Sequence, residues 1–238
     1  MKTRCFIVLL SLFLFVSCGE KRTNPLIQNL DQSWVVTTDT LNIKMQVDVP
    51  SVIQADMYEN GLIPHPYKSN VEPQLLWIPQ HEWTYTLDFV ADDYILDEDV
   101  VELVFEGLDT YADVWFNGKK ILHADNMFRT YSYDVKDIIK EKNNIKIKFY
   151  PFDKERDSLI ETYRLRFPEK YAVMRKAAYQ NGWDWAPRYM NMGIWQPVYL
   201  KAWTRSTICS ASVITKDIHD DKADLFFEAC IHAEVEHN

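Results

Sequence analysis

The sequence is poor in glycine. Only 6 of its 238 residues are glycine, and it contains no low-complexity tract. Because flexible linkers depend on glycine or biased composition, we expect no long flexible region beyond a tether at residues 18–33. In contrast, 47% of the residues are hydrophobic and 14% are aromatic, which is ample for a packed core.

Basic residues are scarce relative to acidic ones. The chain has 26 Lys and Arg against 35 Asp and Glu, a formal net charge of −9. Removal of an amino-terminal signal that holds Lys2 and Arg4 leaves 24 basic residues and a net charge of −11. Since binding to a phosphate backbone requires a basic surface, nucleic acid is not expected as a partner.

Sequence patterns for metal and phosphate chemistry are missing. The six histidines, at positions 65, 81, 123, 219, 232 and 237, show no zinc-type spacing with cysteine or with one another. No glycine-rich phosphate loop and no nucleophile elbow occur, although one sequence does not exclude a dispersed Ser/His/Asp triad. We therefore predict no metal site and no cofactor.

The first 17 residues have the features of an export signal. Lys2 and Arg4 precede an apolar run from Cys5 to Val16, which is too short to span a bilayer as a folded helix. The ending "FVSC" resembles a bacterial lipoprotein signal, so Cys18 is predicted as a lipid anchor to the membrane. This places the protein at the bacterial cell envelope, facing the periplasm or the outside. An ordinary signal that is cleaved elsewhere is the alternative.

Two cysteines remain after the signal and the anchor, Cys209 and Cys230. The run from Asp224 to Val235 alternates as a strand does, with Cys230 on its more polar face. The pattern therefore does not favour a disulfide between them, even in an exported protein.

Short alternating segments predict β-strands. In "WTYTLDFV", residues 83–90, large apolar side chains alternate with Thr and Asp, as in a half-buried strand. Asn117-Gly118 predicts a tight hairpin turn, because both residues tolerate positive φ. Further strands are expected over residues 100–105, 111–116, 119–122, 145–149 and 195–203.

Helical periodicity is rare. It is limited to residues 134–141 and 153–166, while residues 171–179 form either a third helix or an irregular segment. Many short strands without a βαβ rhythm indicate an all-β antiparallel sandwich over residues 34–204. Two more strands follow, separated by the polar turn His219–Lys222. Two strands cannot bury a core of their own, so residues 205–238 either begin a second sandwich or dock on the first.

One stretch concentrates aromatic residues around a carboxylate. In "QNGWDWAPRYMNMGIWQPVYL", residues 180–200, Trp183 and Trp185 bracket Asp184. Either these side chains form a surface for a flat, hydroxylated ligand, or Trp185 lies in the core and Asp184 pairs with Arg188. Trp195, at the start of a predicted strand, is expected in the core.

Several segments, in order, resemble the amino-terminal domain of family 2 β-mannosidases. They are "DVPSVIQADMYENGLIPHPY", "HEWTYTLDF", "GLDTYADVWFNGKKI", "NMFRTYSYDVKDII" and "GWDWAPR" with "GIWQPVYL". The set covers Trp34 to Trp203 almost continuously. The resemblance implies a galactose-binding-like jelly-roll sandwich, the first strands of an immunoglobulin-like sandwich at residues 205–238, and a catalytic (β/α)₈ barrel farther along such proteins.

The resemblance also implies a role for Trp183, Asp184 and Trp185. Their loop is similar to one that reaches into the catalytic pocket and helps to hold the terminal mannose of β-mannosides. The two catalytic carboxylates of the family come from the barrel, so no catalytic residue is assigned and the chain alone is expected to be inactive. A stand-alone carbohydrate-binding lipoprotein and a truncated gene product are the competing interpretations.

The chain departs from the family pattern at three positions. Ala186 stands where glycine is usual, His65 where an acid is common, and Val71 interrupts an expected Asn-Glu pair. The first change would alter the loop if that position required positive φ.

Overall fold

The structure is a computed structural model that describes residues 25–233 except positions 39, 69, 165 and 167–169. Cys18 and the signal lie outside the described residues, so the lipid anchor stays a prediction. None of the helices in the described part is long and apolar enough to cross a membrane.

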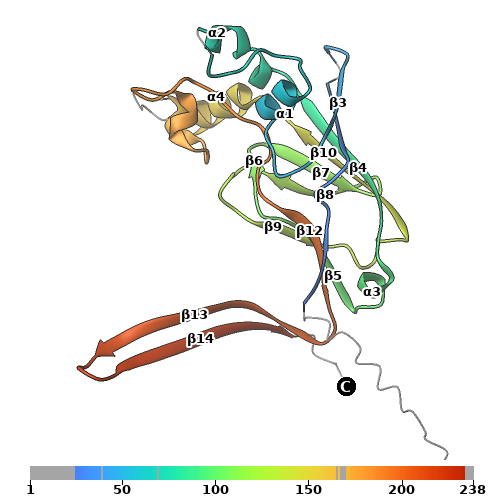
Figure 1. Ribbon diagram of the computed structural model, residues 1–238, viewed down its shortest axis with the longest axis vertical. Helices are drawn as coiled ribbons and strands as arrows, with labels where there is room; N and C mark the ends of the chain where they lie inside the picture. The colour runs from blue at the N-terminus through green and yellow to red at the C-terminus, as the bar shows by residue number, and fades with distance from the viewer. Residues whose placement is uncertain (1–24, 39, 69, 165, 167–169, 234–238) are drawn as a thin grey trace, which may run out of the picture.

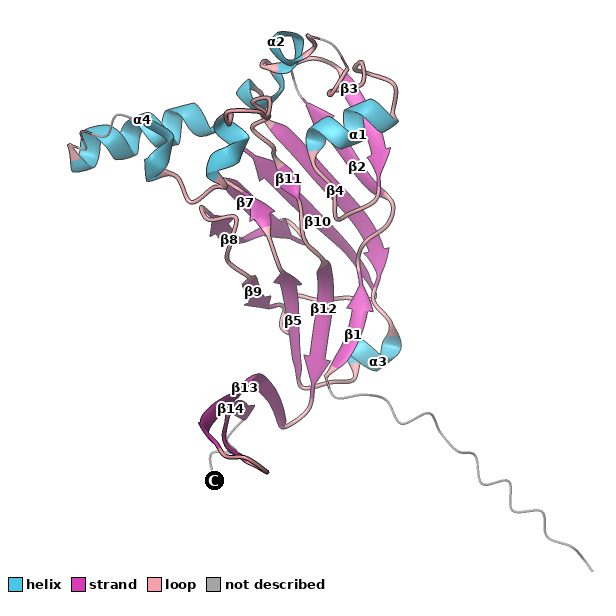
Figure 2. Ribbon diagram, turned by 60° about the vertical axis from the view of Figure 1, so that its left-hand side comes forward, coloured by secondary structure: helices cyan, strands magenta, loops and turns pink. Residues whose placement is uncertain are grey.

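Strands dominate the described chain (Figures 1 and 2). The strands of the sandwich are β1 (Leu26–Asn29), β2 (Trp34–Thr38), β3 (Ile43–Val47), β4 (Trp83–Val90), β5 (Val100–Phe105), β6 (Leu108–Asp109), β7 (Ala112–Phe116), β8 (Lys119–Ala124), β9 (Tyr131–Asp134), β10 (Lys142–Phe149), β11 (Gly193–Ile194) and β12 (Val198–Trp203). They are followed by β13 (Ser206–Ile218) and β14 (Ala223–Ala233). The helices are α1 (Ile53–Glu59), α2 (Glu72–Leu75), α3 (Asp93–Leu96) and α4 (Phe152–Tyr163), with 3₁₀ turns at Ile78–Gln80, Lys170–Val173 and Ala178–Asn181.

The predicted antiparallel sandwich is confirmed. One sheet has the strand order β3-β2-β4-β10-β7-β8 and the other has the order β1-β12-β5-β9. The short pair β11–β6 forms a third piece of sheet. Most of the helices gather at one end of the sandwich, above the six-stranded sheet (Figure 2).

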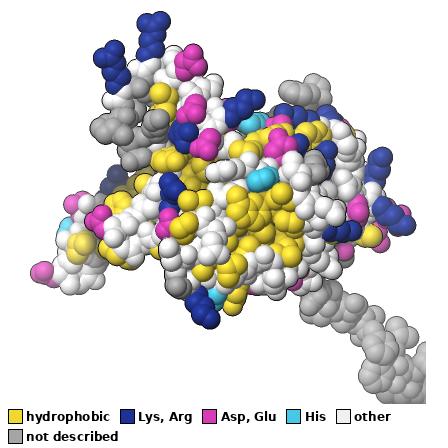
Figure 3. All heavy atoms as spheres, turned by 90° about the horizontal axis from the view of Figure 1, so that it is seen from above, with side chains coloured by type: hydrophobic (Ala, Val, Ile, Leu, Met, Phe, Trp, Pro, Cys, Tyr) yellow, Lys and Arg dark blue, Asp and Glu magenta, His cyan; other side chains and the backbone are white. Residues whose placement is uncertain are grey.

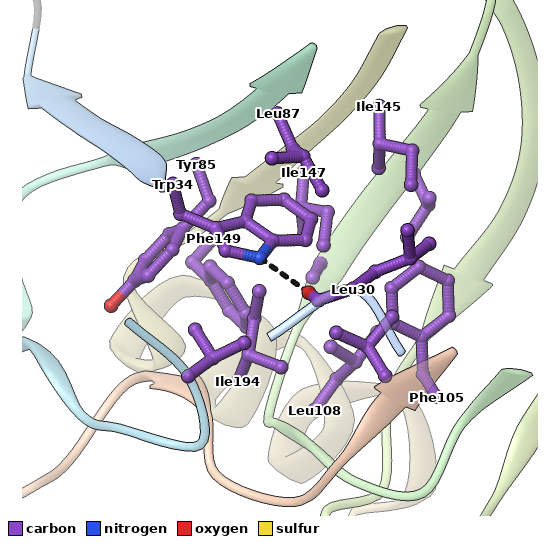
Figure 4. Close-up of a cluster of buried hydrophobic side chains, with 14 of the residues drawn as sticks. Leu30, Trp34, Tyr85, Leu87, Phe105, Leu108, Ile145, Ile147, Phe149 and Ile194 are labelled. Atoms are coloured by element: carbon purple, nitrogen blue, oxygen red, sulfur yellow. Dashed lines mark hydrogen bonds between the residues drawn. The ribbon is translucent and has the colours of Figure 1, made fainter. Parts of the chain in front are cut away.

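The core lies between the two main sheets (Figure 4). Apolar side chains alternate along each strand, so Trp34, Tyr85 and Phe149 from one sheet belong to the same buried cluster as Phe105 from the other. The indole N–H of Trp34 donates to the carbonyl of Leu30, at 2.8 Å. A buried tryptophan N–H needs such a partner, because leaving it unpaired in the interior costs free energy.

The Asn-Gly hairpin is confirmed. Asn117 and Gly118 have φ values of 50° and 82°, and they connect β7 to β8. The side-chain amide of Asn117 also donates to the carbonyl of Ile138, at 2.8 Å. The turn is therefore fixed by the tolerance of Asn117 and Gly118 for positive φ and by the hydrogen bond from Asn117 to the loop that holds Ile138.

Helices α1, α2 and α3 lie where the sequence analysis expected none, and two further segments also differ from the sequence-based expectation. Residues 134–141 form turns rather than a helix, because Val135 is buried and its N–H bonds to the carbonyl of Val101. Residues 26–29, expected within the tether, form β1 and pair with β12. A four-residue edge strand carries too little periodicity to be recognised from sequence.

The last two strands form a ribbon that stands away from the sandwich (Figure 1). Every side chain from Ile208 to Ala233 is exposed, including the apolar Phe226 and Phe227. At the base of the ribbon, the rings of His232 and Trp203 lie 5.7 Å apart. Among the described residues the ribbon therefore does not dock on the sandwich, and an immunoglobulin-like domain stays a prediction.

Cys209 and Cys230 are exposed free thiols on this ribbon. Cys230 lies across from Ser210, beside the irregularity in strand pairing that contains Cys209. A side-chain interaction with the neighbouring Cys209 raises the pKa of the Cys230 thiol.

A buried carboxylate joins α1 to the core. Asp56 accepts hydrogen bonds from the hydroxyls of Ser51 and Tyr85, at 2.5 and 3.0 Å. Burial raises the pKa of Asp56 from 3.8 to about 6, against the opposing effect of the two hydrogen bonds. The group is thus ionised at neutral pH in a place that disfavours charge.

Replacement of Asp56 by asparagine should remove a pH-dependent part of the stability. The folded carboxyl takes up its proton near pH 6 and the unfolded one near 3.8. This group therefore stabilises the fold increasingly as the pH falls from about 7 to about 4, by up to roughly 3 kcal/mol. Urea unfolding across this range should show a difference between wild type and Asp56→Asn that changes with pH. The exposed Asp88→Asn serves as control, and a pH-independent difference for Asp56→Asn would contradict the prediction.

Candidate functional site

The Trp-Asp-Trp loop, residues 182–188, follows the 3₁₀ turn Ala178–Asn181. Trp183 and Ala186 close it through two backbone hydrogen bonds, of 3.3 Å from Trp183 N–H and 3.2 Å from Ala186 N–H. Asp184 and Trp185 form the turn between them. Gly182 has a φ of 99°, which only glycine adopts without strain, and it directs the chain into the loop.

The side chains of this loop face solvent. Trp183 is 57% exposed and Trp185 is 86% exposed. Asp184 is also exposed, and it forms no ion pair or hydrogen bond with any described residue. The alternative in which Trp185 lies in the core and Asp184 pairs with Arg188 is therefore wrong for this structure. The role of the three residues as sugar contacts stays a prediction.

Trp195 is only partly buried, and β12 begins three residues after it. Its indole N–H donates to the carbonyl of Met127, at 3.0 Å. A side chain at Gly107 would collide with the indole ring. The expectation that Trp195 lies in the core is therefore wrong, and the side chain instead links the loops that hold Met127 and Gly107.

An apolar hollow of about 490 Å³ lies against the loop. It is lined by Ala178, Tyr179, Trp183, Trp185 and Ala186. Figure 3, which looks down on the end of the molecule that carries α1 and α2, shows a patch of hydrophobic side chains with charged groups around it. An exposed apolar patch bounded by polar groups is typical of a ligand or partner site.

A buried ion pair holds both flanks of the loop on the sandwich. Lys176 Nζ lies 2.5 Å from Asp109 Oδ1, and both side chains are 1% exposed. The same Nζ donates to the carbonyl of Asn191, at 2.6 Å. Gln180 connects these partners, because its amide donates to Asp109 Oδ2 at 3.1 Å and accepts from Asn191 N–H at 3.0 Å. Burial lowers the pKa of Lys176, and the Asp109 carboxylate opposes this effect.

Loss of the lysine charge should destabilise the protein strongly. Lys176→Met leaves the Asp109 carboxylate buried without a counter-charge, which costs roughly 3–5 kcal/mol. The double variant Lys176→Met with Asp109→Leu removes both charges and should recover a large part of this loss. Urea unfolding measures both, with the exposed Lys119→Met as control. A single variant within about 1 kcal/mol of wild type would contradict the prediction.

Alanine at position 186 is compatible with the loop. Ala186 is not among the residues with positive φ, so the usual glycine is not needed there for backbone reasons. Alanine in place of the usual glycine therefore does not strain the backbone at this position.

Sequence analysis missed several aromatic residues beside the loop. Tyr179 is 62% exposed and lines the hollow, and Tyr58 and Tyr67 lie on neighbouring segments. These tyrosines lie on a short helix, in a loop and in a 3₁₀ turn, and isolated exposed tyrosines in such short segments form no periodic pattern. Only the resemblance of the segment that holds Tyr58 and Tyr67 could have drawn attention to those two. No group of three or more metal-ligating side chains occurs among the described residues.

Comparison with known proteins identifies the fold and the family. The family described as "Glycosyl hydrolase 2 galactose-binding domain-like" matches residues 31–196. The chain belongs to this family. The predicted galactose-binding-like sandwich is thereby confirmed, together with the resemblance to the amino-terminal domain of β-mannosidase-like proteins.

Its relatives include several β-mannosidases. The chain is 29% identical to β-mannosidase of Mus musculus over 188 residues, which are 74% of this chain and 21% of that protein. It is 33% identical to β-mannosidase A of Emericella nidulans over 183 residues, 71% of this chain and 19% of that protein. The crystal structure of β-D-mannosidase from Dictyoglomus thermophilum matches with a TM-score of 0.78 and 30% identity, covering 87% of this chain and 26% of that one. The chain thus spans about a fifth of the length of the curated relatives it matches.

Proposed function

We propose that this chain supplies the amino-terminal domain of a β-mannosidase-like glycoside hydrolase and contacts the terminal β-mannosyl residue through Trp183, Asp184 and Trp185. The observation that carries this proposal is the exposed loop whose carboxylate has no partner within the described chain. The β-mannosidase relatives support the substrate class.

The chemistry of the loop suits a sugar. A pyranose ring offers apolar C–H faces, which pack against indole rings, and hydroxyl groups, which donate to a carboxylate. Hydrogen bonds to a charged acceptor are roughly twice as strong as neutral ones. Asp184 would therefore fix the orientation of the ring, and Trp183 and Trp185 would supply contact area.

Bond cleavage requires groups that we do not assign to this chain. Retaining hydrolysis of a glycoside uses two carboxyl groups about 5–5.5 Å apart, one on each side of the scissile bond. We propose that a barrel domain provides both, so residues 1–238 bind and position without cleaving. The predicted signal and Cys18 would place such an enzyme at the bacterial cell envelope.

The second candidate is a stand-alone carbohydrate-binding lipoprotein. The two exposed indoles favour it, because they are available in this chain alone. It predicts saturable sugar binding that is lost in Trp183→Ala. The gene region after codon 238 separates the candidates, since a barrel-coding frame supports the hydrolase and an unrelated sequence supports the binding protein.

The purified chain should not hydrolyse a chromogenic β-mannoside, because it lacks an assigned nucleophile and proton donor. In a protein that joins this domain to its barrel, Asp184→Asn should lower kcat/KM by about 100-fold through the loss of charge-assisted hydrogen bonds. The exposed Asp221→Asn should leave kcat/KM unchanged. Turnover by the chain alone, or wild-type kcat/KM in Asp184→Asn, would refute the corresponding part of the proposal.

A further inference from the structure

A second cavity, of about 320 Å³, adjoins the Trp-Asp-Trp loop. Its walls come from α1, from the segment around His65, from the 3₁₀ turn Ala178–Asn181 and from the chain after the loop. All four walls belong to the described chain. The cavity is therefore a second concavity beside the hollow that lies against the loop.

Hydrogen bonds between the walls keep the cavity in shape. The backbone N–H of Ile53, at the start of α1, donates to the carbonyl of Met192, at 2.8 Å. The side-chain amide of Gln54 donates to the carbonyl of Met190, at 2.9 Å. The hydroxyl of Tyr189 donates to the carbonyl of Pro66. These bonds connect α1 and the His65 segment to the chain that follows the loop.

Aromatic rings make up much of the lining. The ring of His65 meets that of Tyr58 edge-on at 5.0 Å and lies 6.3 Å from that of Tyr67. Tyr67 in turn meets Tyr189 edge-on at 5.6 Å. Edge-on contacts fix the rings at large angles to one another, so their faces are presented in different directions around the cavity.

Polar groups of the lining remain without partners inside the described chain. The hydroxyls of Tyr58, Tyr67 and Tyr179 form no hydrogen bond with a described residue. Gln54 is 5% exposed, and its side-chain oxygen has no partner among the described residues. His65 Nδ1 accepts from Tyr67 N–H, at 3.1 Å, so the neutral ring carries its proton on Nε2 as a donor. The lining thus offers hydrogen-bond donors and acceptors as well as apolar ring faces.

Charge is missing from the lining. Among the described residues, no Asp, Glu, Lys or Arg side chain borders the cavity. A charged ligand would find no counter-ion there, and burying an unpaired charge is costly. The cavity therefore favours a neutral ligand that carries both hydroxyl groups and apolar faces. Its volume lies at the lower end of the range for ligand pockets, roughly 300–1,000 Å³, which suits one sugar ring.

We propose that this cavity is a separate carbohydrate subsite that holds one neutral hexose ring beside the Trp-Asp-Trp loop. Its assignment to the second sugar of a β-mannoside rests on the proposed function. Tyr179 and Ala186 line both the cavity and the apolar hollow against the loop, so the two surfaces are contiguous. A disaccharide would place one ring on each.

Titration of the full chain with β-1,4-mannobiose, followed by NMR, tests the subsite. Binding should saturate with a Kd in the millimolar range. Tyr67→Ala and Tyr58→Ala should each raise this Kd at least about fivefold, because a stacking surface and a free hydroxyl are lost. Tyr163→Ala, at a tyrosine on α4 that is 66% exposed against 74% for Tyr67, should leave it unchanged. Glucuronic acid should bind about tenfold more weakly than methyl β-mannoside, since the lining offers no cation.

Two outcomes would overturn the subsite. Binding that is lost in Asp184→Asn but kept in Tyr67→Ala would place the sugar on the loop, and no saturation up to about 100 mM would leave the cavity without a ligand. Neither outcome affects the turnover test of the proposed function, so the two failures are distinguishable. In a protein with its barrel, Tyr67→Ala should raise KM for mannobiose and leave KM for an aryl β-mannoside unchanged. An equal rise for both would refute the assignment to the second sugar.

Discussion

The buried pair of Asp109 and Lys176 is the interaction on which the candidate site depends. Asp109 ends β6, in the core of the sandwich, whereas Lys176 belongs to the irregular segment that leads into the Trp-Asp-Trp loop. Through Gln180 and Asn191 the pair reaches both sides of the loop. A buried carboxylate and a buried ammonium group keep each other in place, because separating them would leave each charge buried and unpaired. A loop with little core of its own thus takes its position from the sandwich.

The sandwich was predictable because its strands obey simple rules. In β4 and β10, large apolar side chains occupy nearly every second position, and the side chains on the opposite face are partly or fully exposed to solvent. The Asn117-Gly118 turn required only local preferences. In contrast, α1 and β1 depend on contacts with residues far away in sequence, such as the hydrogen bonds from α1 to the chain near β11. Short elements held by distant partners carry little signal of their own.

The candidate site was predictable only in part. Trp183, Asp184 and Trp185 stand out because two tryptophans flanking a carboxylate are unusual, and the family resemblance gave them a role. The aromatic cavity was not found, because Tyr58, Tyr67 and Tyr179 come from separate segments that only the folded chain brings together. His65, noted as a departure from the family pattern, is part of that cavity. The lysine of the buried pair also gave no signal, since nothing local distinguishes Lys176 from an exposed lysine.

The ring of Tyr179 forms a common border of the hollow and the cavity. Two sugar rings on either side of it would be held at a spacing set by the width of one phenol. A spacing of that kind discriminates by the geometry of the glycosidic linkage, because linkages at different carbons place successive rings at different distances and angles. Selectivity for chain connectivity would then reside in this domain, apart from recognition of the ring that is cleaved.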